Sequence, residues 1–242
     1  MKAIVFEIDA ISQLNLEIMQ AVIAKNEEIQ KLSEDGLGPL ALASALSDFY
    51  MISASLESGH NQLDAEQMAE FGDYGMDLLD RQSAQLRHLD ILYQPELLSR
   101  IYASLALWMA RHDAVLNNIE GTADGFAWLV NGLTEKEDLA EMCGYMEEVI
   151  NAISEKVALD EDRSNPWRPW RILNLNTGIA ATRSLDPQLM EKTFDKLGRH
   201  LPYDMAEFLA DGKRQMMTQN VPDEVSETMN RYVEKWPTKP SH

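Results

Sequence analysis

The sequence predicts an all-α protein, built as an array of antiparallel helical hairpins that stack into an α-solenoid. Apolar residues recur at the three- and four-residue spacing of amphipathic helices along nearly the whole chain. No convincing stretch alternates apolar and polar residues as a half-buried strand would. Turn and cap residues separate the apolar stripes, so we expect about ten helices joined by short turns. An irregular helical bundle around a single core is the alternative architecture.

The first half of the chain contains four predicted helices and a shorter fifth one. Asp64 is placed to cap the third helix, and Pro95 suits the first turn of the fourth. The short helix stops at Gly132. The apolar stripes that define these five helices lie at residues 11–29, 42–56, 68–86, 98–119 and 126–130.

The second half begins with Thr134-Glu-Lys-Glu137, which has the form of a capping box. The most regular apolar stripe of the chain follows it. Asp186 and Pro187 then form a cap and a first helical residue. The segment 167–183 is apolar on more than one side, which indicates a sheltered helix. The stripes of this half lie at residues 139–157, 167–183, 190–201, 202–212 and 225–236.

The charge distribution bears on domain organisation. Residues 1–162 carry 9 basic and 30 acidic side chains, whereas residues 163–242 carry 12 and 10. The step falls in the acidic, turn-rich segment 160–166, a possible sub-boundary. Because the helical pattern continues across it, we expect a single all-helical domain over residues 1–236. Residues 237–242 are expected to form a flexible tail.

One segment resembles a tetratricopeptide repeat. Trp170-x-x-Leu173 is similar to the start of that family's first helix, with Asn174 where glycine is usual and Thr177 where an aromatic residue is usual. A second helix then follows Asp186-Pro187 and closes at Pro202. The resemblance covers residues 166–202, with a vaguer similarity at 40–86. It implies a right-handed stack of hairpins whose concave face binds a peptide or protein segment.

The composition narrows the partners that the protein can have. The formal net charge is −19, which opposes binding to nucleic acid and to anionic membranes and favours a basic protein partner. The longest uncharged runs, residues 36–47 and 172–182, are too short to span a bilayer. The single cysteine, Cys143, excludes an intramolecular disulfide and fits a reducing compartment. We therefore expect a cytoplasmic protein.

Reactive groups are few. The chain has no phosphate-binding loop, HExxH motif or nucleophile elbow, so we expect no metal and no cofactor. His112 lies on the same stripe as Trp108, where a half-buried histidine could serve as a general base in a pocket between helices. A core-edge histidine with an internal hydrogen bond is the interpretation that we favour. Cys143 also lies on an apolar stripe and is expected to be buried rather than nucleophilic.

The segment 166–171 stands out because it contains two tryptophans and two arginines, types that are enriched where proteins bind one another. Trp167, Arg168, Trp170 and Arg171 are therefore the candidate partner-binding residues. In the alternative interpretation, both tryptophans anchor a helix in the core and the arginines pair with acidic residues.

The leading functional hypothesis is a non-catalytic scaffold or adaptor, whose acidic helical body binds a protein or peptide. The competing hypothesis is a helical enzyme or small-molecule-binding protein with a pocket near Trp108 and His112. A homodimer formed through the helix at residues 134–157 is compatible with either.

Overall fold

The computed structural model describes residues 4–33, 38–91, 95–161, 163–218 and 221–237. These residues form eleven helices and no strand, which confirms the all-α prediction. A single parallel bridge pairs Leu116 with Ile153. The predicted tail lies outside the described residues except for Pro237.

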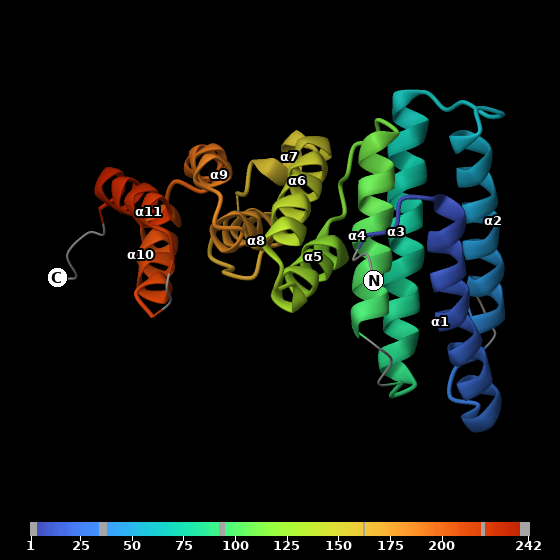
Figure 1. Ribbon diagram of the computed structural model, residues 1–242. Helices are drawn as coiled ribbons and strands as arrows, with labels where there is room; N and C mark the ends of the chain where they lie inside the picture. Colours follow the sequence, from blue (N-terminus) through green and yellow to red (C-terminus); the bar gives the residue numbers. More distant parts are fainter. Residues whose placement is uncertain (1–3, 34–37, 92–94, 162, 219–220, 238–242) are drawn as a thin grey trace.

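The helices follow one another across the molecule in roughly chain order, from α1 and α2 at one edge to α10 and α11 at the other (Figure 1). Consecutive helices pack on one another along most of this length. In chain order they are α1 (Ile8–Ile29), α2 (Pro39–Glu57), α3 (Ala65–His88), α4 (Pro95–Arg111), α5 (Glu120–Gly132), α6 (Lys136–Ala152), α7 (Glu155–Ala158), α8 (Pro169–Arg183), α9 (Pro187–His200), α10 (Met205–Met216) and α11 (Asp223–Lys235).

Two of the helix caps predicted from the sequence are present in the structure, and a third is not. Asp64 forms a complete capping box with Gln67, and Asp186 accepts hydrogen bonds from the first backbone amides of α9. The box predicted at Thr134 is wrong. The chain is still extended at Glu135, the N-cap of α6, and the Thr134 hydroxyl donates to the Glu135 side chain instead of capping the helix.

Two predicted helices end earlier than their apolar stripes. The stripe at 98–119 overruns α4, which stops at Arg111 because Asp113 turns the chain with a φ of 60°. The stripe at 139–157 is divided between α6 and α7. Leu116 explains the division, since its amide donates to the Ala152 carbonyl and its carbonyl accepts from the Ser154 amide. Leu116 is buried, as is Ile153, so these stripes continue as core contacts after the helices end.

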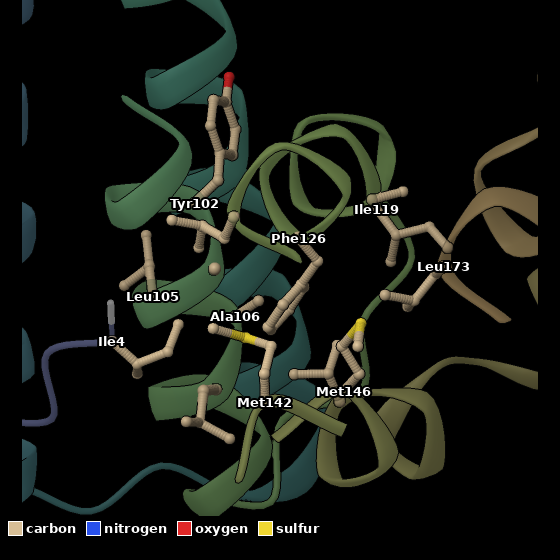
Figure 2. Packing of buried hydrophobic residues seen from close by; sticks show 14 of the residues in the cluster. Ile4, Tyr102, Leu105, Ala106, Ile119, Phe126, Met142, Met146 and Leu173 are labelled. Atoms are coloured by element: carbon tan, nitrogen blue, oxygen red, sulfur yellow. The ribbon is translucent and has the colours of Figure 1, made fainter. Parts of the chain in front are cut away.

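Helix α4 is buried on nearly all sides. Every residue from Ile101 to Met109 is buried, and α1, α3, α5 and α6 all pack against this helix. Helices α1 to α4 thus form a group in which α1 contacts α2, α3 and α4. Figure 2 shows where this group meets the rest of the core: Leu105 and Ala106 of α4 face Phe126 of α5 and Met142 of α6. Residues 101–110 of α4 carry no charged side chain and require such enclosure, because an exposed face of this stretch would be apolar.

The hydrophobic core continues past the acidic segment 160–166. Helix α8 follows that segment and packs on α5 and α6, which precede it. Leu173 of α8 lies beside Ile119 and Met146 in the same cluster (Figure 2). The net charge of the chain therefore changes at a turn between helices, and the apolar core continues across that turn.

Two helices bear on the expectations that the protein does not contact a membrane and that it can form a homodimer. Helix α2 is long and apolar enough to cross a membrane by length and composition, although core helices also meet that criterion. Asp48, near the middle of this helix, is exposed. The apolar stripe of α6, which includes Leu139 and Met146, is buried against α4 and α8. A dimer formed through α6 would have to use another face of that helix.

Close helix packing predicts opposite effects for two Gly→Ala substitutions. A Cβ on Gly75 of α3 would collide with the buried ring of Phe49, which is itself stacked on Phe71, so G75A should destabilise the protein by about 1–3 kcal/mol. A Cβ on Gly144 of α6 would meet nothing within 4 Å, so G144A should stabilise it by about 0.5–1 kcal/mol. Urea denaturation of both variants measures the two signs, and equal effects would contradict this packing.

Candidate functional site

Residues 163–171 lead into α8 through a short turn. Asn165 organises this turn, since its side chain accepts a hydrogen bond from the Trp167 amide at 2.9 Å. Pro169 is the first residue of α8, where its missing amide hydrogen costs no hydrogen bond. Trp167 therefore precedes the helix, whereas Trp170 and Arg171 belong to its first turn.

The two arginines of this segment form a partly buried ion network with two aspartates. Arg168 Nε lies 2.5 Å from Asp160 Oδ1, and its Nη2 lies 3.3 Å from Asp204 Oδ2. Arg171 Nε lies 2.5 Å from the other Asp204 oxygen. All four side chains are largely shielded from water. We call these residues the ion network; they join the turn after α7 to the start of α8 and to the residue before α10.

The two tryptophans point to different environments. Trp170 is buried and its ring lies 5.1 Å from that of His200, whereas Trp167 is 76% exposed. They do not share a helical face, because Arg168 is the N-cap and Trp167 lies outside the helix. The interpretation of both tryptophans as core anchors is thus correct for Trp170 and wrong for Trp167. The pairing of both arginines with acidic residues is confirmed.

Three large apolar side chains are exposed around the ion network. Leu159, Trp167 and Tyr203 are 61%, 76% and 77% exposed. Each comes immediately before a member of the network, namely Asp160, Arg168 or Asp204. We call these three residues the apolar patch. The ion pair of the adjacent residue restrains the backbone at each of the three positions. The Arg163 guanidinium adds to the patch, since it lies 4.7 Å from the centre of the Tyr203 ring.

A groove between α8 and α10 begins at the same ion network. Its volume is about 230 Å³, and Arg171 and Asp204 line it together with the half-buried apolar residues Leu175, Ile179 and Phe208. We call it the α8–α10 groove. Gly178 lets the Phe208 ring lie against α8, because a Cβ there would stand 2.6 Å from the ring. Sequence reasoning located one end of this groove, at Arg171, but not the groove itself.

The alternative pair, Trp108 and His112, forms a compact internal contact. Their rings are stacked with centres 4.1 Å apart. His112 Nδ1 donates to the Trp108 carbonyl at 2.8 Å, and Trp108 Nε1 donates to Glu57 at 3.3 Å. His112 therefore has the internal hydrogen bond that we favoured. Neither residue lines the α8–α10 groove or the acidic cavity described next.

An acidic cavity of about 400 Å³ lies between α3, α4 and α5. The Tyr102 hydroxyl donates to Asp80 at 2.7 Å, and burial raises the pKa of Asp124. Sequence reasoning missed this cavity because its residues come from three separate helices and share no motif. Among the described residues, no cluster of histidine, cysteine and carboxylate side chains is arranged to hold a metal ion.

Comparison with known proteins found no matching family model, no similar curated protein and no similar solved structure. The tetratricopeptide resemblance therefore rests on the residues of this chain alone.

The ion network predicts unequal effects for two Asp→Asn substitutions. D204N removes the charge shared by two largely buried arginines, so it should destabilise the protein by roughly 1.5–3 kcal/mol. D195N removes an exposed partner of Lys235 and should cost less than about 1 kcal/mol. Urea denaturation at neutral pH compares the variants, and equal losses would show that the network is not a major contributor to stability.

Cys143 is predicted to be unreactive in the folded protein. Burial raises the pKa of its thiol to about 11, so little thiolate forms at pH 8, and the fully buried sulfur is closed to reagents. An aromatic disulfide reagent should label it only as fast as the protein unfolds. Immediate labelling of the native protein, at the rate seen in denaturant, would contradict this burial.

Proposed function

We propose that this protein is a non-catalytic scaffold or adaptor that binds a protein or peptide partner at the apolar patch. The observation that carries the proposal is the placement of Leu159, Trp167 and Tyr203, each largely exposed and each next to a partly buried, ion-paired residue. Large apolar side chains that are exposed favour association, because a partner removes them from water. A rigid base beneath them lowers the entropy lost on binding.

The arginines have a supporting role in this proposal. Arg168 and Arg171 already bond to Asp160, Asp204 and two backbone carbonyls, so most of their donors are engaged within the chain. Trp170 is buried and serves the same supporting role. Of the four residues singled out by the sequence, Trp167 is the one that offers a large free apolar surface.

We further propose that residues 169–235 form a tetratricopeptide-like pair of stacked hairpins. Helices α8 and α9 make the first hairpin, and α10 and α11 make the second. Contacts between the hairpins support the stacking, since α9 packs on α11 and α8 packs on α10. The Phe194 and Tyr232 rings lie 5.2 Å apart across the α9–α11 contact. Helices α1 to α4 pack around α1, and α4 also packs on α5 and α6, so we confine the proposed repeat to the C-terminal part.

The charge of the protein supports a basic partner. The acidic excess lies in residues 1–162, next to the region that carries the patch. Such a potential attracts a basic protein at long range and falls off with salt, whereas the apolar patch would provide the short-range contact. Partner capture should therefore weaken as ionic strength rises.

Replacing both exposed aromatic residues tests the proposal. W167A/Y203A should keep the stability of the natural protein within about 0.5 kcal/mol, because both rings are mostly in water. It should reduce the capture of partner proteins from lysate about tenfold or more. W128A is the matched control, since Trp128 lies on α5 and is 40% exposed. Undiminished capture by the double variant, measured by quantitative mass spectrometry, would contradict the proposal.

A further inference from the structure

The α8–α10 groove has the length and the lining of a binding site for a helical segment. Its lining residues on α8 are spaced four, four and three apart, at Arg171, Leu175, Ile179 and Thr182. Those on α10 follow the same kind of spacing from Asp204 to Gln215. Each set is therefore one face of a helix, and each extends over about 16 Å, the length of three helical turns. The two helices approach at Arg171 and Asp204 and again at Gly178 and Phe208.

The floor of the groove is apolar and incompletely covered. Leu175, Ile179 and Phe208 contribute to the core but keep part of their surface in the groove. The volume of about 230 Å³ lies below the range of about 300–1,000 Å³ typical of sites that enclose a small molecule. An elongated site of this size suits a row of side chains from a protein segment better than an enclosed ligand.

The charges of the groove differ between its two walls. On the α8 side, Arg171 is paired with Asp204, and Arg183 donates to the carbonyls of Val130 and Leu133. On the α10 side, Glu207 and Asp211 lie one turn apart. Glu207 is exposed and has no ion pair among the described residues, and Asp211 has only the exposed Arg214 as a partner. Exposed pairs of that kind are weak and readily exchanged.

From this arrangement we infer that the α8–α10 groove binds an amphipathic helix with an apolar ridge, flanked on one side by basic residues. The ridge lies on Leu175, Ile179 and Phe208, and lysines or arginines spaced four apart face Glu207 and Asp211. The inference rests on the proposed function, because it names the kind of partner that the scaffold accepts. It adds a second contact, separate from the apolar patch, and gives the groove a preference for one charge pattern.

Two synthetic peptides of about 16 residues test the inference on the full chain. Both carry leucines along one helical face; one has lysines spaced four apart on a single flank of that face, and the other has glutamates there. Fluorescence anisotropy should show the lysine peptide binding at least about tenfold more tightly than the glutamate peptide at low salt. Equal affinities, or no binding of either peptide, would overturn the inference.

Charge reversal on α10 locates the binding. E207K/D211K should weaken the lysine peptide about tenfold and strengthen the glutamate peptide. E224K/E227K makes the same change in net charge on exposed residues of α11, so it should change either affinity less than about twofold. Equal effects of the two double variants would overturn the inference, because binding would then follow net charge alone.

The remaining outcomes separate this inference from the proposed function. If W167A/Y203A abolishes partner capture while neither peptide binds, the groove inference fails and the scaffold proposal stands. If the lysine peptide binds as expected while W167A/Y203A leaves partner capture unchanged, the patch fails and the groove stands. If light scattering shows a dimer that E207K/D211K dissociates, a second copy occupies the groove and the inferred partner is wrong.

Discussion

Residues 101–110 of helix α4 cannot be left in contact with water on any side, and much of the architecture follows from that constraint. Residues 101–110 contain no charged side chain, and all of them are buried or nearly so. Burying them requires neighbours all round, which α1, α3, α5 and α6 provide. Because α4 contacts both the N-terminal helices and the helices that follow, it fixes the position of one group against the other. The successive helices beyond α6 then extend the same core in one direction (Figure 1).

The ion network determines how the turn after α7, the start of α8 and the start of α10 are placed relative to one another. Two arginines and two aspartates are costly to bury singly, but together each offsets the charge of another. The arrangement ties the turn after α7 to α8 and to α10. It also leaves the preceding residues, Leu159, Trp167 and Tyr203, on the outside. Internal electrostatics therefore positions the apolar surface that we propose as the binding site.

The reactive groups that we considered are buried or hydrogen-bonded within the fold. Cys143 is buried with its pKa raised to about 11, and His112 is bonded to the Trp108 carbonyl of α4. The acidic cavity near Tyr102 uses one of its carboxylates, Asp80, to accept hydrogen bonds from Tyr102 and Asn118. The proposed binding role rests on the exposed apolar side chains and on the charge pattern of the groove.

The sequence by itself determined the all-α class, the approximate helices and the caps at Asp64 and Asp186, because periodicity and capping are local properties. It also singled out residues 166–171 by composition. Only the tertiary structure decided that α4 stops at Arg111 and that α6 breaks at Ile153, since the Leu116 bridge joins residues far apart in the chain. It likewise decided that Trp167 is exposed and Trp170 buried. That separation depends on Asp160 and Asp204, which lie 8 and 36 residues from Arg168, and no local pattern encodes such a pairing.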